Sequence, residues 1–580
     1  MKALRNSILG LFAGLLCAAA FAQTGGFPRV GPSGQPHVSP QAQHQQSSMY
    51  RYLESDEGRA WMQVSGNPKS KALNQRFGEP SPAALERARI LLHQMKTQPS
   101  QLEPEPAAKS QPCNGESGAR FNLEPRVNAV LQVTPTADFI VNGAGAGSDL
   151  IVQTATDARG NLPPGGPWDG SLSGYYVHTS STADCSVQFE GGLPNFNNTM
   201  GLGTTSVVAD SVRGAVFAAD NRFVYGGAIF RASTADLLNP SKCPHGTHTA
   251  AQAESCWMQT PPVQIDPTYQ SSIYPVLAVD ERSSGTGAGD VYIVGEAQSM
   301  FIMACTNSLS HCSAMENVGN SDGQFYAFVQ ARPDGLITIS YMQDAQGVTE
   351  TVNFVTCTPA GAPKPPVCGT PVTVATVNTM YLNAPTGIAP IGFSYTQHAD
   401  RLESDGSFTT FLVYDACTNV YTPPPPPNDP PTYCVNTRVY ATFSTDNGQT
   451  WSKPVSVDNK DGFHTFPTIT NDASTGTVSI VHLSTEGDYF EQEERVVLNQ
   501  ILPGSTALGP SKPVTSFTSN ANFANLLPGG PDLFMGAIAR GTGISGQSHL
   551  YLSFNSIAVN GIYNREPVPE MNNTIKLLTY

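Results

Sequence analysis

From about residue 120 onward, short apolar segments alternate with glycine-rich polar turns. The segment 274–297 (YPVLAVDERSSGTGAGDVYIVGEA) places an aromatic-Pro step before an apolar run, an aspartate, a glycine-rich turn and a second apolar run. The segment 466–484 (FPTITNDASTGTVSIVHLS) repeats this order. Apolar, β-branched and aromatic runs that are bounded by Gly, Asn, Asp and Ser predict strands joined by turns. Both segments therefore predict β-hairpins.

Looser copies of this hairpin pattern recur along the chain. Strands that are apolar on both faces are buried on both sides, and several sheets that repeat around an axis bury such strands while leaving only short edges. We therefore predict an all-β fold, a six- or seven-bladed β-propeller of four-stranded blades. A stacked array of sandwiches is the alternative. The looser copies are 128–157, 214–231, 324–342, 391–415 and 533–554.

The first 112 residues have a different pattern. Residues 1–22 combine Lys2 and Arg5 with an apolar run and a small-residue cleavage site, which predicts a secretory signal peptide. Residues 23–112 form an extension that is polar and low in complexity at first, which predicts disorder. It then contains two segments with helical signals, the second of which begins at Ser81 as N-cap. We expect the propeller to occupy 113–580.

Charge and hydropathy exclude several functions. The formal net charge is −15. A protein that binds nucleic acid needs a basic surface, so this charge argues against nucleic-acid binding. No segment after the signal peptide is apolar for long enough to span a membrane as a helix. We therefore expect a monomer secreted to the periplasm or the extracellular space of a bacterium, with no nucleic-acid partner and no membrane span.

The cysteine positions predict disulfides. The chain has 11 cysteines, and removal of the signal peptide with Cys17 leaves an even number in an oxidising compartment. Sequence does not prove connectivity, but neighbours along the chain are close enough to pair. The expected pairs are Cys243/Cys256, Cys305/Cys312, Cys357/Cys368 and Cys417/Cys434, which leaves Cys113 for Cys185.

Two segments could instead bind a metal ion. Cys243 and Cys256 flank His245 and His248, a set of residue types that ligates zinc. In an oxidising compartment the disulfide is the favoured interpretation. The acidic turn 458–462 could bind calcium, although it lacks the ligand spacing of an EF-hand. We expect no metal centre and no cofactor, with calcium as the alternative.

One turn carries a specific motif. Between the predicted strands 437–443 and 453–457, the sequence reads Ser-x-Asp-x-Gly-x-Thr-Trp. A glycine supplies a positive φ, and an aspartate accepts hydrogen bonds from the backbone of its own turn. The motif resembles the Asp box, or BNR repeat, of bacterial sialidases and related propellers. Its residues are Ser444, Asp446, Gly448, Thr450 and Trp451.

The resemblance implies a sialidase-like propeller, and it sets a test for catalysis. Sialidases hold a substrate carboxylate with three arginines, use a tyrosine nucleophile paired with a glutamate, and use an aspartate as acid/base. The nearest candidate for the first arginine is Arg126, which lacks the family's Arg-Ile-Pro pattern. Tyr489 and Glu491 are the candidate nucleophile and partner. A solvated acidic loop is the alternative interpretation of 486–495.

Two functions therefore remain open. The first is a secreted, non-catalytic propeller that binds a glycan or an extracellular protein. The second is a glycoside hydrolase, an exo-alpha-sialidase with a diverged active site. We favour the first, because the arginine motif is missing and because a fold does not specify an activity.

Overall fold

The computed structural model describes most of the chain between residue 132 and residue 579. Long described stretches cover most of 132–157, 171–222, 226–265, 275–319, 324–378, 395–421, 433–486 and 493–515, and shorter pieces lie before and after them. The predicted signal peptide, and most of the extension that follows it, lie outside the described residues. Within that extension, Ser81 Oγ accepts a hydrogen bond of 3.2 Å from the Ala84 backbone N–H. This is the contact expected of an N-cap.

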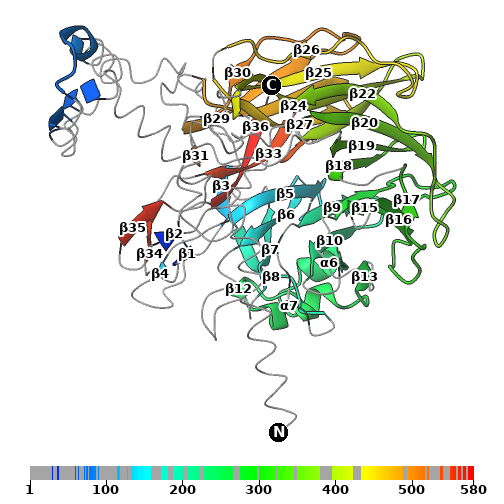
Figure 1. The fold of residues 1–580 in the computed structure, drawn as a ribbon. Helices are drawn as coiled ribbons and strands as arrows, with labels where there is room; N and C mark the ends of the chain where they lie inside the picture. Colours follow the sequence, from blue (N-terminus) through cyan, green and yellow to red (C-terminus); the bar gives the residue numbers. More distant parts are fainter. Residues whose placement is uncertain are drawn as a thin grey trace.

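The described chain is mostly β, and its sheets are antiparallel meanders. In the first half of the chain, three sheets follow one another along the sequence (Figure 1). The first contains β5 (Gln132–Ile140), β6 (Leu150–Asp157), β7 (Ser173–Thr179), β8 (Val187–Gly192) and β12 (Gly246–His248). The second contains β9 (Ser206–Asp210), β10 (Ala215–Asn221), β11 (Gly227–Ser233) and β13 (Val263–Ile265). The third contains β14 (Val276–Val279), β15 (Val291–Glu296), β16 (Met300–Cys305) and β17 (Glu316–Asn317).

The second half of the chain continues with a nine-stranded sheet and two smaller sheets, and β34 (Asn560–Tyr563) and β35 (Glu566–Pro569) form a further small sheet with β4 (Val127–Asn128). The nine-stranded sheet begins with β18 (Gln324–Ala331), β19 (Ile337–Asp344), β20 (Thr349–Thr358), β21 (Val367–Cys368) and β22 (Val372–Asn378). It continues with β23 (Thr396–Leu402), β24 (Phe408–Tyr421), β25 (Tyr433–Ser444) and β26 (Val455–Ser456). The next contains β27 (His464–Asp472), β28 (Thr477–Ser484), β29 (Glu493–Ile501), β30 (Lys512–Pro513) and β31 (Ser519–Asn520). The last contains β32 (Gly536–Ala539), β33 (His549–Ser556), β36 (Asn572–Thr579) and β3 (Asn114–Ser117).

The first strands of successive meanders lie against one another and close a ring. Along the chain, β5 contacts β9, β9 contacts β14, β14 contacts β18, β18 contacts β23, β23 contacts β27, and β27 contacts β32. The ring closes because β32 contacts β5. In the same sheet as β32, the N-terminal strand β3 pairs with the C-terminal strand β36. The arrangement is propeller-like rather than a row of sandwiches, as Figure 1 shows.

The sheets differ from the six or seven similar, four-stranded blades that the sequence predicts. Asn378 of β22 pairs with Cys417 of β24, and this single pair joins two meanders into the nine-stranded sheet. The parallel strand β12 extends the first sheet beyond four strands. The ring is therefore not built from six or seven separate, uniform four-stranded blades. The physical reason is that the unusually long strand β24 reaches its neighbour's outer strand.

The core lies between neighbouring sheets, because the strands are apolar on both faces. In β10, Val216 and Ala218 belong to the cluster shared with the first sheet, while Phe217 and Ala219 belong to the cluster shared with the third. Successive side chains of a strand point to opposite faces. The alternation therefore packs one strand against both of its neighbours in the ring.

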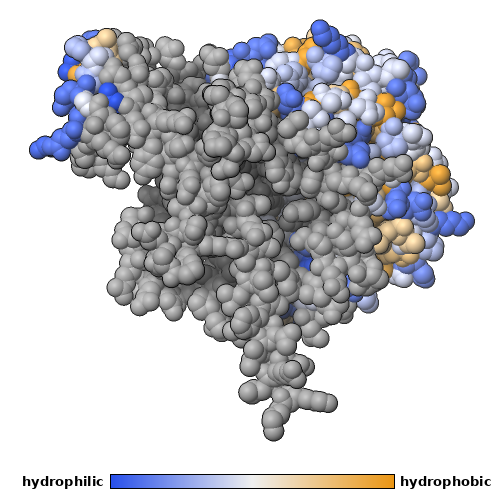
Figure 2. Space-filling view, viewed as in Figure 1, coloured by the Kyte–Doolittle hydropathy of each residue, from blue (hydrophilic) through white to orange (hydrophobic). Residues whose placement is uncertain are grey.

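Helices are short in the described part of the chain. Besides fragments of the N-terminal extension, it contains α6 (Thr234–Leu237) and α7 (Ala250–Trp257). Within that part, no helix has the length and apolar character needed to cross a membrane. Figure 2 shows hydrophilic residues over most of the coloured surface, with small apolar spots between them. Large exposed apolar side chains include Val212, Val367, Leu402, Val455 and Leu502.

Candidate functional site

The sequence-predicted catalytic candidates cannot be placed. Arg126, Tyr489 and Glu491 lie outside the described residues. The described residue closest before Tyr489 is Glu486, which follows β28. The surroundings of Glu486 therefore show what lies at the base of this loop.

The direction of the strands divides the ring into two edges. In an antiparallel meander, the turns between the first and second strands and between the third and fourth strands share one edge, which we call the hairpin edge. The turn between the second and third strands, and the passage to the next meander, share the other, which we call the crossover edge. The motif turn 444–451 joins β25 to β26 and lies on the hairpin edge. Residues 457–460, Gly462, Phe463 and Glu486 lie on the crossover edge.

A buried cluster of Asp458, His464 and His482 occupies the crossover edge. The three side chains each offer one ligand atom, and these atoms lie within 4.8 Å of one another. His464 Nδ1 and His482 Nε2 are 3.2 Å apart. His464 opens β27 opposite Ser484 of β28, so His482, two residues from Ser484, is its diagonal neighbour on the same face. All three side chains are buried.

The backbone of Lys460 orients two members of this cluster. Its N–H donates to Asp458 Oδ1 at 3.0 Å. Its carbonyl oxygen lies 3.1 Å from His464 Nε2. A carbonyl only accepts, so His464 Nε2 carries the proton and His464 Nδ1 presents its lone pair to the cluster. Two buried atoms, Asp458 Oδ2 and His482 Nδ1, have no hydrogen-bond partner.

Burial keeps both imidazoles neutral. Desolvation is the largest cause that lowers the pKa of His464, and it lowers the pKa of His482 to about 3 with a further contribution from His464. Burial alone would raise the pKa of Asp458. The hydrogen bond from the Lys460 N–H, the nearby imidazoles and the Ser511 hydroxyl outweigh burial and lower that pKa. Near neutral pH the cluster is one carboxylate beside two neutral imidazoles.

Charged side chains surround the cluster, and they are paired with one another. Glu486 accepts from Lys460 Nζ at 2.9 Å and from the Arg495 guanidinium at 3.1 Å. Arg438 donates to the carbonyl oxygen of Gly462 at 2.6 Å. The side chain of Arg495 is buried while that of Lys460 is exposed. The loop that follows Glu486 therefore starts from a fixed, charge-paired base.

Arginines on the hairpin edge are occupied in contacts between neighbouring meanders. Each pairs with a carboxylate of its own turn, at 2.6–3.1 Å. Each also reaches the next turn along the ring. Arg213 donates to the carbonyl of Arg282 at 2.7 Å, Arg282 to the carbonyl of Asp334 at 3.3 Å, Arg332 to Asn447 Oδ1 at 2.9 Å, and Arg401 to the carbonyl of Leu502 at 3.1 Å.

Other described arginines of the ring are also bonded. Arg222 is buried, pairs with Asp220 at 2.7 Å and donates to the carbonyls of Thr199 and Pro194. Arg231 donates to Asn307 Oδ1 at 3.4 Å. Arg159 and Arg540, like Arg126, lie outside the described residues.

The motif turn is held together by its own side chains. Asp446 Oδ1 accepts from the Ser444 hydroxyl at 2.8 Å and from the Thr450 N–H at 2.9 Å, and its Oδ2 accepts from the Thr450 hydroxyl at 2.6 Å. These bonds, that from the Thr450 hydroxyl most of all, lower the pKa of Asp446 to about 2. Trp451 Nε1 donates to the carbonyl of Gly448 at 3.0 Å, and its ring meets Phe354 edge to face.

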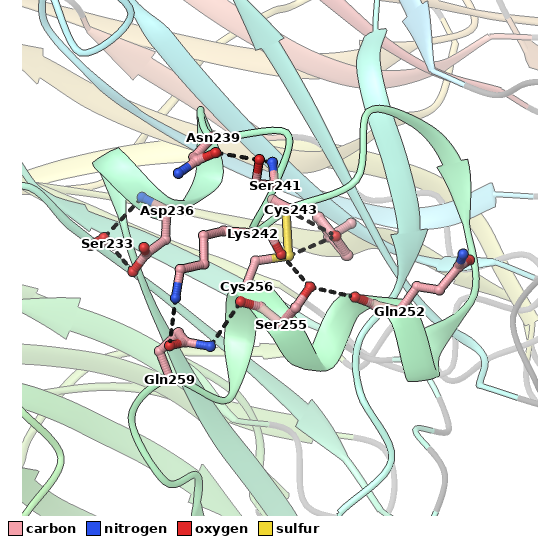
Figure 3. Close-up of a disulfide and its surroundings, with 11 residues drawn as sticks. Ser233, Asp236, Asn239, Ser241, Lys242, Cys243, Gln252, Ser255, Cys256 and Gln259 are labelled. Carbon is pink, nitrogen blue, oxygen red and sulfur yellow. Dashed lines mark hydrogen bonds between the residues drawn. A yellow bond between two sulfur atoms is a disulfide. The ribbon is translucent and has the colours of Figure 1, made fainter.

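Three of the expected disulfides are present in the described residues: Cys243–Cys256, Cys305–Cys312 and Cys357–Cys368. Cys417 is disulfide-bonded as well. Cys113 and Cys185, and the side chain of Cys434, lie outside the described residues. Figure 3 shows Cys243–Cys256 joining a loop to α7, with Ser255 donating to the carbonyl of Lys242. The two sulfurs bond each other, and His245 stacks on Phe189, so this segment is a disulfide loop rather than a zinc site.

Sequence reasoning missed His464 and His482 as a pair. They stand in the segments GFHTFP and SIVHLS, and 18 residues separate them. The available signal was the hairpin itself, but it was not sufficient. Extending the regular pairing of this hairpin would place the two histidines on opposite faces, and only the register shift between Thr465 and Thr468 brings them to the same face.

Comparisons with known proteins give only distant structural likenesses. No protein-family model matches the chain, and no curated protein matches it. Polysaccharide lyase Uly1 is 9% identical with a TM-score of 0.40, over 81% of this chain and 98% of that one. A Dyadobacter fermentans protein of unknown function is 9% identical with a TM-score of 0.36, over 78% and 99%. The Hadza microbial sialidase Hz136 is 12% identical with a TM-score of 0.35, over 63% and 65%. Similarity at this level gives no information about the activity of this protein.

Proposed function

We propose that the protein is a secreted, non-catalytic propeller that binds a glycan. The observation that carries the proposal is the state of its arginines. A sialidase needs three guanidinium groups free to converge on a substrate carboxylate, and such pairs are strong because each is bidentate. In the described part of the ring, four arginines instead donate hydrogen bonds to neighbouring turns: Arg213, Arg282, Arg332 and Arg401.

These arginine contacts are structural because breaking them leaves buried groups unpaired. The side chains of Arg332 and Arg401 are 2% and 3% exposed. A substrate that recruited either guanidinium would have to remove it from a carboxylate and from an acceptor on the next turn. Asp334 and Glu403, the carboxylate partners, are 35% and 21% exposed, so breaking either pair costs less than the roughly 3–5 kcal/mol of a fully buried ion pair. A carboxylate clamp built from these residues is therefore disfavoured.

The choice of a glycan as ligand is supported by the resemblance of the motif turn to the Asp box. The hydrogen bonds of the turn have the self-contained arrangement expected of the Asp box that it resembles, and it lies on the hairpin edge, away from the crossover edge. The resemblance implies a carbohydrate-related propeller. An extracellular protein is the other ligand class that the sequence left open.

A glycan microarray probed with labelled mature protein, residues 23–580, tests the proposal. We expect binding to a defined set of glycans, with competition by the same free oligosaccharide and no loss of the arrayed sugar. The matched control is the reduced and unfolded protein, which should not bind. An array with no signal above this control would contradict glycan binding and would favour a protein ligand.

A further inference from the structure

We propose that Asp458, His464 and His482 form a binding site for a transition-metal ion of the zinc class. The inference does not depend on glycan binding, because it concerns the passage between two meanders rather than a ligand surface. Zinc is bound by imidazole nitrogens and carboxylate oxygens. The cluster supplies two of the first and one of the second, from separate strands and a loop.

The spacing of the two imidazoles fits this ion. A tetrahedral site with metal–nitrogen distances of about 2.0–2.1 Å holds its nitrogens about 3.3 Å apart. His464 Nδ1 and His482 Nε2 are 3.2 Å apart. The same spacing would suit a hydrogen bond between the rings, so the spacing alone does not decide between the two.

The unpartnered oxygen of Asp458 favours the ion. Asp458 Oδ2 is a buried acceptor without a partner, and a buried polar group without a partner costs about 1–3 kcal/mol. Its other oxygen is already held by the Lys460 N–H. A cation among the three side chains gives the free oxygen a partner, which an imidazole–imidazole hydrogen bond does not.

One of the two histidines has the outer contact of a prepared site, whereas His482 Nδ1 has no hydrogen-bond partner. Metal-binding histidines usually donate their second N–H to a carbonyl or carboxylate, which fixes the ring and its tautomer. His464 does this through Nε2 to the carbonyl of Lys460. The nearby cations Lys460 and Arg495 both pair with Glu486, which leaves a net charge of +1 on these three side chains. Zinc bound here would tie the passage 458–464 to β28.

Metal binding by the whole mature protein tests the inference. After chelation and dialysis, we expect Zn²⁺ binding at one equivalent per chain, and Co²⁺ to give the visible absorption of a tetrahedral site. X-ray absorption spectroscopy at the zinc edge should show two imidazole ligands and no sulfur ligand on the bound zinc. Loss of a residue that only supports a metal ligand weakens metal binding by about 10–100-fold. Loss of a ligand itself should weaken Zn²⁺ binding by more, as we expect for His482→Gln and for the nearly isosteric Asp458→Asn.

His398→Gln is the matched control. His398 is also a buried histidine, but its nitrogens contact Ser340 and Thr338. This variant should bind zinc as the wild type does. The inference is overturned if the wild-type protein takes up no zinc, if its bound zinc has a sulfur ligand, or if folded His482→Gln binds as tightly as the wild type. The first two of these results are measured on the wild-type protein alone. They can therefore overturn the inference even if the variants do not fold.

Discussion

Arg332 donates to Asn447 at 2.9 Å, although 115 residues separate them. The arginine stands after β18, and the asparagine lies inside the motif turn of the next meander. The Arg332 guanidinium also pairs with Asp334 at 2.6 Å, and it lies 4.0 Å from the centre of the Phe408 ring. One side chain thus joins two meanders on the hairpin edge.

A double-mutant cycle measures this link. Arg332→Met removes the guanidinium, and Asn447→Gly removes the amide while tolerating the positive φ of 57° at this position. We expect the two changes to be non-additive by about 0.5–3 kcal/mol in the free energy of unfolding, as for residues in one network. Guanidinium chloride unfolding measures it. Additive effects would show that the contact does not stabilise the ring.

Gly448→Ala should destabilise the protein more than Gly406→Ala. The two glycines have positive φ angles of 82° and 85°, so each alanine carries the same backbone cost. A Cβ at Gly448 would overlap the Phe354 ring, whereas a Cβ at Gly406 would have no atom within 4 Å. Overpacking costs about 1–3 kcal/mol. Thermal unfolding of both variants measures the difference. Equal melting temperatures would contradict the packing of this turn on Phe354.

Asp415 should make stability depend on pH. Burial raises the pKa of Asp415 from 3.8 to about 7. Between these values the folded chain holds a proton that the unfolded chain has lost, so this contribution to stability falls as the pH rises from about 4 to about 7. A tenfold difference in proton affinity between the folded and unfolded chains corresponds to about 1.4 kcal/mol.

Asp415→Asn removes that titration. We expect wild-type stability to fall relative to the variant between about pH 4 and pH 7, by up to a few kcal/mol. Unfolding of both proteins at each pH measures it, and other titrating groups such as His398 cancel in the comparison. A difference between the two proteins that stays constant or grows with pH would contradict the assignment.

Peptide mapping of the non-reduced mature protein should find the two remaining cysteine pairs. Cys417 is disulfide-bonded, and nearest-neighbour pairing assigns it to Cys434 and assigns Cys113 to Cys185. Thiol titration under denaturing conditions should find no free cysteine. A bond from Cys417 to any cysteine other than Cys434, or a free thiol in this set, would contradict that connectivity.

The sequence predicted the features that depend on neighbouring residues. The apolar strands of 274–297 and 466–484 form the hairpins β14–β15 and β27–β28. The motif turn closes on its own side chains because Ser444, Asp446 and Thr450 are close along the chain. Three short-range cysteine pairs are bonded for the same reason.

Features that depend on distant residues could not be predicted. The link from Arg332 to Asn447 requires the order of the meanders around the ring, and linear spacing does not contain it. The fusion of two meanders depends on one pair, Asn378 with Cys417. His464 and His482 look like ordinary strand residues until the register of their hairpin places them on one face.

The central claim is that this ring does not cleave its ligand. The most direct measurement is the release of fluorophore from a fluorogenic sialoside by purified mature protein, with Tyr489→Phe as the paired variant. The account predicts that the wild-type protein and the variant release no more than a buffer blank does. Release by the wild-type protein that Tyr489→Phe abolishes would contradict it.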